Sequence, residues 1–311
     1  MKTIDIIGKR KIWYAISLII IIPGLISLVT HGLRLGIDFT GGSLMEVQGI
    51  ASQEVVTQAV GDLGFKDITV TTTSGNRTQI RYRDESEASK QETDHQTFKA
   101  NLEKKGFTEV TFDAIGPSVS RDIARNAIIA ILIASLAIVL YIALAFRNVP
   151  PPASPWRFGI AAVAALLHDV LLLLGVFSLL GVFFNVEVNA LFVTAVLTVM
   201  GFSVHDTIVV FDRVRENLRR ERKEFDEIVN DSILETLVRS LNTSLTVLLT
   251  LLALFLFGGQ SIRLFVLALI IGIASGTYSS IFNATPLLVT WQHYITKRAL
   301  KSQTAQNKVS K

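Results

Sequence analysis

The chain has 311 residues, of which 50% are hydrophobic and only 18% are charged, and its mean hydropathy is +0.47. Soluble domains usually carry about 25% charged residues, so this composition favours a membrane protein with several spans and one further domain. The absence of cysteine excludes disulfides, thiolate metal sites and cysteine nucleophiles. The net charge of +4 is small, so the distribution of Lys and Arg carries more information than their sum.

Six apolar stretches are long enough to cross a bilayer, which takes roughly 20 residues in a helix. The first lies within residues 1–31, and we expect a retained helix because no small-residue cleavage site follows it. The other predicted spans are residues 124–146, 158–180, 188–211, 238–257 and 264–291.

Basic residues flank these spans unevenly, and this asymmetry predicts the orientation. Lys and Arg precede the first span, border the loop at 147–157, crowd residues 213–223 and follow the sixth span in the tail, residues 292–311. The two remaining short loops hold a single Arg. Because cytoplasmic loops are enriched in Lys and Arg, we expect six spans with both termini in the cytoplasm.

Residues 213–237, between the fourth and fifth spans, combine many charges with a partial apolar stripe. This pattern predicts an amphipathic segment on the cytoplasmic face of the bilayer. Acidic residues alternate with the basic ones, so we expect no nucleic-acid site.

The polar residues 32–123 follow the first span and are expected outside the cytoplasm. Their periodicity predicts the order strand, helix, strand, strand, helix, strand, which is the ferredoxin-like arrangement. The predicted fold class is therefore an α-helical polytopic membrane protein carrying an α+β extracytoplasmic domain. This domain shows no metal cluster, phosphate loop or catalytic triad, and His95 is expected on its surface. Contact with a partner or an extended chain is its expected use.

Ionisable residues interrupt three of the spans, where a charge costs at least about 2.5 kcal/mol at mid-bilayer and so has to face protein or water. They are His168 and Asp169 in the third span, His205 and Asp206 in the fourth, and Arg239 near the start of the fifth.

Threonines accompany two of these residues at helical spacing. Thr194 and Thr198 share a face with Asp206, whereas Thr243 and Thr246 share one with Arg239. If these faces meet, they form a polar seam of carboxylate, guanidinium and hydroxyls with room for water. Burial makes an aspartate able to take and release protons, and a nearby guanidinium opposes this effect, so the seam predicts a proton path.

Other interpretations remain open for the same residues. Arg239 lies close enough to the cytoplasmic edge to be an interfacial residue. Asp206 can serve as a structural polar contact between helices. His168 and Asp169 can be a buried hydrogen-bonded pair that fixes helix packing.

Four motifs in order along the chain resemble the SecF family of membrane subunits, within the resistance–nodulation–division superfamily. They are "GIDFTGG" at 36–42, "HDV" at 168–170, "DTIVVFDRVREN" at 206–217 and "LVRSLNTS" at 237–244. The resemblance runs from the first span to the end of the sixth and so covers nearly the whole chain. The order and spacing of the motifs among these spans make it specific.

This resemblance implies a non-enzymatic protein-transport role in the bacterial cytoplasmic (inner) membrane, without cofactor or metal. It implies pairing with SecD and the use of the proton-motive force to move preproteins through SecYEG, with a YajC-like accessory protein. It further assigns the proton-path carboxylate to Asp206 and the arginine to Arg239. Many members have Asn where this chain has His205, which adds either a second titratable group or a hydrogen-bond partner.

The "GIDFTGG" motif is expected to be structural, with Gly36 and Asp38 leading into a tight turn at Gly41 and Gly42. Two competing functions remain. One is an independent proton-coupled transporter of the same superfamily, although six spans make half of its usual unit. The other is an intramembrane aspartyl protease using Asp169 and Asp206, although its GxGD signature is absent.

Overall fold

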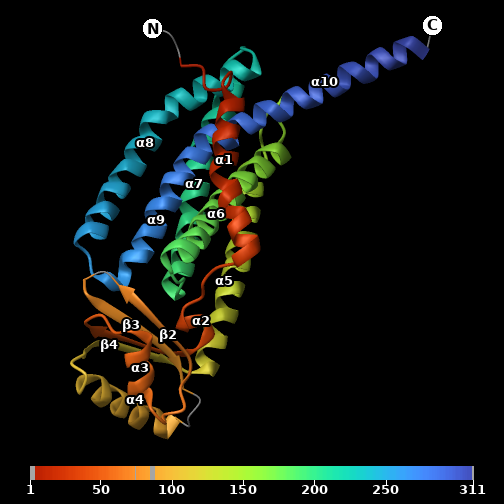
Figure 1. The fold of residues 1–311 in the computed structure, drawn as a ribbon. Helices are drawn as coiled ribbons and strands as arrows, with labels where there is room; N and C mark the ends of the chain where they lie inside the picture. The colour runs from red at the N-terminus through yellow and green to blue at the C-terminus, as the bar shows by residue number, and fades with distance from the viewer. Residues whose placement is uncertain (1–3, 74, 85–87, 310–311) are drawn as a thin grey trace. The chain divides into compact units, whose positions relative to one another are not determined.

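A computed structural model describes residues 4–73, 75–84 and 88–309, and these fall into two compact units. Residues 1–34 and 130–311 make up a helical unit, and residues 35–129 make up a smaller α+β unit (Figure 1). The two units are described separately below.

Six helices in the described residues are long and apolar enough to span a membrane, as predicted. The sixth is a continuous rod in which α9 passes through a π-helical turn, η1, into α10. The bounds are α1 Arg10–His31, α5 Pro117–Ala145, α6 Pro155–Phe184, α7 Ala190–Arg220, α8 Phe225–Phe257, α9 Gln260–Ser279, η1 Ser280–Ala284 and α10 Thr285–Val309.

Several helices extend well beyond the predicted spans. Residues 213–237, expected as one separate amphipathic segment, are divided between the end of α7 and the beginning of α8. Only residues 221–224 separate these two helices. The polar part of each helix therefore continues the apolar part without a break.

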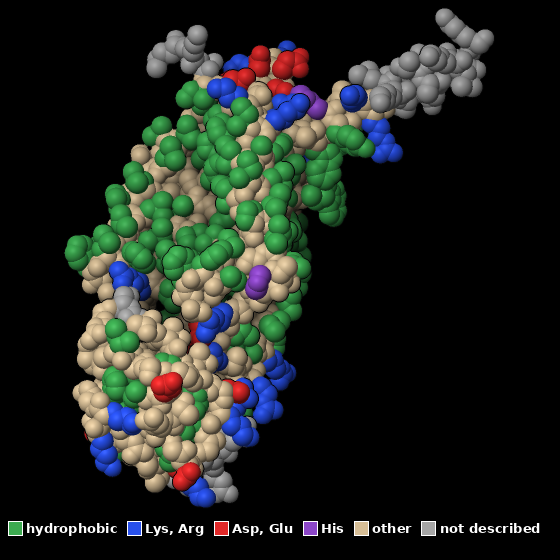
Figure 2. Space-filling model, viewed as in Figure 1, with side chains coloured by type: hydrophobic (Ala, Val, Ile, Leu, Met, Phe, Trp, Pro, Cys, Tyr) green, Lys and Arg blue, Asp and Glu red, His purple; other side chains and the backbone are tan. Residues whose placement is uncertain are grey.

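Four helices form the packed centre of the helical unit. α7 and α9 pack on each other, α6 packs on both, and α8 packs on α7 and α9, while α1 covers α6. By contrast, only 6% of the most apolar window of α5 is buried, against 50% for α7. Hydrophobic side chains cover the visible sides of this unit, and charged ones gather at the end that carries the α7–α8 connection (Figure 2). This distribution suits a protein surrounded by lipid.

Glycines bring these helices into backbone contact. Gly24 of α1 faces Gly175 of α6, and a Cβ at Gly24 would lie 2.8 Å from the Cα of Gly175. At Gly272 of α9, a Cβ would lie 2.2 Å from Cγ2 of Val199 on α7. Small residues at such crossings let helices in a membrane approach closely, and here Gly272 brings α9 close to α7.

The α+β unit has the predicted order of strands and helices and a four-stranded antiparallel sheet in the order β2-β3-β1-β4. A single helical turn, α2, precedes the sheet. The bounds are α2 Ile37–Thr40, β1 Gly42–Gln48, α3 Gln53–Val60, β2 Lys66–Thr73, β3 Arg77–Arg83, α4 Ala88–Glu103 and β4 Thr108–Ile115.

The expectation that His95 lies on the surface was wrong. His95 is buried, its ring stacks on Phe112 at a centroid distance of 3.6 Å, and its Nε2 lies 3.2 Å from Glu109. The reason is helical phase: positions 95, 98 and 102 lie on one face of α4, and Phe98 and Leu102 belong to the core. His95 is therefore part of the packed interface between α4 and β4.

Candidate functional site

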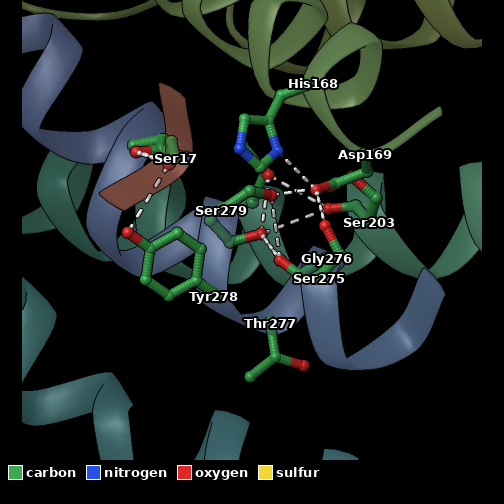
Figure 3. A network of polar contacts seen from close by, with 12 residues as sticks. Ser17, His168, Asp169, Ser203, Ser275, Gly276, Thr277, Tyr278 and Ser279 are labelled. Carbon is green, nitrogen blue, oxygen red and sulfur yellow. Dashed lines mark hydrogen bonds and ion pairs between the residues drawn. The ribbon is translucent and has the colours of Figure 1, made fainter. Parts of the chain in front are cut away.

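Asp169 of α6 is the most enclosed carboxylate in the helical unit, with no exposed surface. It accepts hydrogen bonds from the hydroxyls of Ser203 on α7 at 2.6 Å, Ser275 on α9 at 2.7 Å and Ser279 on α9 at 2.6 Å. Figure 3 shows these three hydroxyls directed at its two oxygens. We call Ser203, Ser275 and Ser279 the serine cluster. Together with Asp169 it joins three helices around one carboxylate. Its hydrogen bonds offset the free-energy cost of burying that carboxylate away from water.

His168 precedes Asp169 and lies at the edge of this cluster. Its Nδ1 is 2.9 Å from Asp169 Oδ1, whereas its Nε2 is buried and has no hydrogen-bond partner among the described residues. Its ring is 6.5 Å from that of Tyr278, which donates a hydrogen bond to the Trp13 carbonyl of α1. The pair predicted from the sequence therefore exists and connects α6 with the interior of the bundle (Figure 3).

Asp206 of α7 is also buried, with 5% of its surface exposed, and its hydrogen bonds are longer. It accepts from Thr277 of α9 at 3.1 Å and from Ser244 of α8 at 3.4 Å, and these two hydroxyls lie 2.6 Å apart. His205 has Nδ1 at 3.4 Å from Asp206, but its side chain is 64% exposed. Asp206 is thus held by hydroxyls of two neighbouring helices, and His205 lies on the outer surface.

Arg239 is not among the hydrogen-bond or ion-pair partners that the described residues give Asp206. It is exposed and lines a pocket of about 380 Å³ between α7 and α8. We call this the α7–α8 pocket. Its lining consists of Val209, Asp212, Arg213, Glu216, Glu235, Thr236 and Arg239.

The threonines predicted to form a polar seam lie on less buried faces. Thr194, Thr243 and Thr246 are exposed and Thr198 is half-buried. Each of the four hydroxyls bonds to a carbonyl of its own helix. In this chain, the buried hydroxyls around the two carboxylates come from other positions.

Sequence reasoning missed the residues that contact the two carboxylates, namely Ser203, Ser244, Ser275, Thr277 and Ser279. One signal was available: Ser240 and Ser244, like Ser275 and Ser279, are four residues apart and therefore share a helix face.

The "GIDFTGG" motif forms a turn in the α+β unit that requires its last two glycines. Gly36 precedes the α2 turn, which includes Asp38, and Gly41 and Gly42 follow with φ of +70° and +112°. A Cβ on Gly42 would lie 2.9 Å from the carbonyl oxygen of Tyr82. Both the positive φ and the close approach therefore exclude a side chain at this position.

Within residues 4–73, 75–84 and 88–309, no group of three or more His, Asp or Glu side chains is arranged to hold a metal ion. The helical unit instead offers two buried carboxylates, each with its own hydroxyl donors. Hydroxyls both donate and accept hydrogen bonds, so these donors can hydrogen-bond either an ionised or a protonated carboxyl group.

Two family models match this chain. Residues 95–294 match "Protein export membrane protein SecD/SecF, C-terminal", and residues 26–48 match "SecD/SecF GG Motif". The chain is 50% identical over 305 residues to the protein translocase subunit SecF of Thermobaculum terrenum, with 93% of this chain and 94% of the relative covered. It is 44% identical to the SecF of Anaerolinea thermophila, with the same coverage of each chain.

Longer relatives contain the same region as one part. The SecDF of Bacillus subtilis is 33% identical over 97% of this chain, which spans 39% of that protein. The solved structure of SecDF, a translocon-associated membrane protein from Thermus thermophilus, matches with a TM-score of 0.80 and 31% identity. That match covers 94% of this chain and 39% of the other. These matches cover both described units, and the chain belongs to the SecD/SecF family of protein-export membrane proteins.

Proposed function

We propose that this chain is the SecF-type accessory subunit of a bacterial Sec protein translocase, and that proton transfer through Asp206 drives its contribution to preprotein export. Relatives named as translocase subunit SecF cover more than nine-tenths of the chain, and the chain covers more than nine-tenths of them. The relatives are named as transport subunits, which supports an accessory role without catalysis. The proton step rests on the surroundings of Asp206.

The observation that carries the proton step is that Asp206 is buried and held by hydroxyls. Thr277 and Ser244 donate to it at 3.1 and 3.4 Å. A hydroxyl both donates and accepts hydrogen bonds. The same two side chains therefore hold Asp206 in either state, donating to the carboxylate and accepting from the protonated acid. A partner with only donors, such as a guanidinium in contact, would favour the carboxylate alone.

Arg239 is proposed to act from the α7–α8 pocket, where it lies beside carboxylates of α7 and α8. A positive charge near a carboxylate favours the ionised form. A change in the separation between Arg239 and Asp206 would therefore alter the proton affinity of Asp206.

A SecD-like subunit is the proposed partner. In the longer SecDF relatives this chain corresponds to 39% of the length, and the remainder leaves room for a partner joined in the same polypeptide. In this chain, α5 and α8 leave most of their apolar windows unburied. SecYEG, a YajC-like protein and the translocating preprotein are proposed as further partners, on the family resemblance alone.

The competing functions have less support. An aspartyl protease requires two carboxylates that share a proton, yet no hydrogen bond joins Asp169 to Asp206 among the described residues, and each has its own hydroxyl donors. An independent transporter would function without a SecD-like partner. Co-purification separates these cases: a chain that supports proton-coupled transport when no SecD-like protein is bound would favour the transporter.

The test of the proton step is the substitution Asp206→Asn, which keeps the shape of the side chain and removes its titration. We expect loss of the part of preprotein export that depends on the proton-motive force, while the complex with the SecD-like subunit still assembles. Asp113→Asn, on the exposed surface of β4, makes the same chemical change elsewhere and should leave export normal. Proton-dependent export that persists in Asp206→Asn would refute the assignment.

A further inference from the structure

The inner face of α8 carries a hydroxyl at every fourth position. Ser232, Thr236, Ser240 and Ser244 are all buried, and residues four apart lie one above the other on a helix. We call these four the α8 hydroxyl row. The row belongs to the face that packs on α7 and α9, because Ser232 bonds with Asn217 of α7 and Ser244 with Thr277 of α9.

The two ends of the α8 hydroxyl row meet two different features. Near one end, one position along the row from Ser232, Thr236 lines the α7–α8 pocket, which also contains the charged groups of Glu235 and Arg239. At the other end, Ser244 donates to Asp206. The row therefore runs from the pocket to the carboxylate along the buried side of one helix.

Ser240, in the middle of the row, differs from its neighbours. Its side chain is 3% exposed, and its hydroxyl has no hydrogen-bond partner in the described part of the chain. Ser232 and Thr236 donate to carbonyls of their own helix at 2.7 and 2.8 Å. Ser240 makes no such bond to the Thr236 carbonyl. A buried hydroxyl without a partner is costly, and water is the usual partner of buried polar groups that lack one in the protein.

The spacing fits water on both sides of Ser240. Thr236 and Ser244 are eight residues apart, about 12 Å along the helix axis at 1.5 Å per residue. Ser240 divides this span into two steps of about 6 Å each, and one water that bridges two hydroxyls through hydrogen bonds of about 2.8 Å covers such a step. A direct hydrogen bond of about 2.8 Å between two successive hydroxyls is too short to span a step of about 6 Å.

We infer that the Ser240 hydroxyl binds water between the α7–α8 pocket and Asp206, and that it is a relay position through which protons pass from that carboxylate to the pocket. This inference rests on the proposed function. The O–H bond of Asp206 breaks first. In each step one oxygen gains a proton from its neighbour and releases another of its own protons to the next, and the last O–H bond forms on water in the α7–α8 pocket. No atom is oxidised or reduced, and each relay hydroxyl ends with the same number of protons as at the start.

Several titratable groups surround this route. Asp206 and His205 lie on α7 at its inner end, and α9 contributes the Thr277 hydroxyl there. At the pocket, α8 contributes Glu235 and Arg239, and α7 contributes the three residues Asp212, Arg213 and Glu216.

An alternative is that Ser240 serves only as a small residue in the packing of α8, because small residues let helices pack closely in membranes. Under that alternative the site is dry and alanine is an equal replacement. Two experiments on the complex with the SecD-like subunit separate these readings.

The first experiment measures access of water to position 240. The chain contains no cysteine, so Ser240→Cys introduces the only thiol in this subunit. We expect it to react with a small cationic methanethiosulfonate, and an enlarged Thr236→Leu side chain at the pocket should slow the reaction. Ser178→Cys is the matched control, because Ser178 is equally buried but bonds to Ser27 and the Gly32 carbonyl. Equal protection of both thiols would overturn the inference.

The second experiment measures proton flux in membrane vesicles that contain the complex. Ser240→Ala should lower the flux about tenfold, as expected for loss of about one hydrogen bond along the route, whereas Ser240→Thr retains the hydroxyl and should restore most of it. Ser135→Ala, on α5, removes a hydroxyl that bonds only to its own helix and should behave as the wild type.

The outcomes of the flux measurement also separate the inference from the proposed function. If Asp206→Asn abolishes flux while Ser240→Ala leaves it normal, the relay role of Ser240 falls and the function stands. If Asp206→Asn leaves flux normal, the proposed function itself fails. Flux lost in Asp206→Asn and Ser240→Ala but retained in Ser240→Thr supports both.

Discussion

Asp169 and Asp206 lie on different helices but are held by the same turn of α9. Ser275 and Ser279 donate to Asp169, and Thr277, which lies between them in sequence, donates to Asp206. α7 makes a second connection, because Ser203 binds Asp169 one turn before Asp206. Movement of α9 relative to its neighbours would therefore change the surroundings of both carboxylates together.

The different enclosure of the two carboxylates predicts different effects on stability. Asp169→Ala leaves the buried hydroxyls of Ser203 and Ser275 without an acceptor, while Ser279 keeps its bond to the Gly276 carbonyl, and should lower the free energy of unfolding by about 3 kcal/mol or more. Asp206→Asn, which replaces two longer hydrogen bonds, should cost only about 1 kcal/mol. Thermal or denaturant unfolding of the purified protein in detergent would measure both. A larger loss for Asp206→Asn would contradict the structure.

The contact between Gly24 and Gly175 predicts a sharp response to a single methyl group. Gly175→Ala would place its Cβ 2.9 Å from the backbone of Gly24, so α1 and α6 would have to separate, at a cost of about 1–3 kcal/mol. Gly159→Ala, on the same helix, meets nothing within 4 Å and should be neutral or stabilising by up to about 1 kcal/mol. The same unfolding measurement compares them, and equal effects would show that the two helices do not touch there.

Tyr82, in the core of the α+β unit, predicts a loss of stability in alkali. Burial raises the pKa of Tyr82 above its ordinary value of 10.0. The unfolded chain therefore ionises first, and this contribution to stability is complete below pH 10 and declines as the pH rises above it. The difference in tyrosinate absorbance between the wild type and Tyr82→Phe should show a titration above the ordinary value. A difference curve centred at the ordinary value would contradict this.

The distribution of basic residues predicts which side of the membrane each segment faces. With both termini cytoplasmic, Lys297→Cys should react with a membrane-impermeant thiol reagent only after spheroplasts are opened. Lys104→Cys, in the α+β unit, should react in intact spheroplasts. Both positions are exposed, so accessibility within the protein is not limiting. The reverse labelling pattern would overturn the predicted orientation.

The spans and the α+β order could be predicted because each depends on a local period or length. Bilayer thickness sets the length of an apolar helix, and alternation of side chains marks a strand. The ionisable residues in the spans were recognised for the same reason, because a charge among apolar residues stands out in a sequence. Asp169 and Asp206 were both found in this way.

The helix face that points inward could not be predicted from one chain. Positions 239, 243 and 246 and positions 232, 236, 240 and 244 show nearly the same spacing on α8. The presence of Arg239 favoured the first set as the polar face, whereas the structure buries the second. Which face of α8 is buried depends on the positions of α7 and α9. The spacing of residues along α8 gives no information about those positions. The prediction for His95 was wrong for a related reason, because a mostly polar helix gave little indication of which side faces the sheet.

The π-helical turn at Ser280–Ala284 divides the last long helix into two differently oriented halves. An α-helix turns by about 100° per residue, and a π-helical turn includes one residue more than the regular ladder. Before it, Ser279 faces Asp169; after it, Thr290 hydrogen-bonds with Tyr14 of α1 at 3.0 Å. A chain that lost one residue here would gain a more regular rod, but one half would be rotated by more than a quarter-turn, away from its neighbours. The irregularity thus allows a single rod to keep two sets of contacts that an ideal helix of the same sequence could not make together.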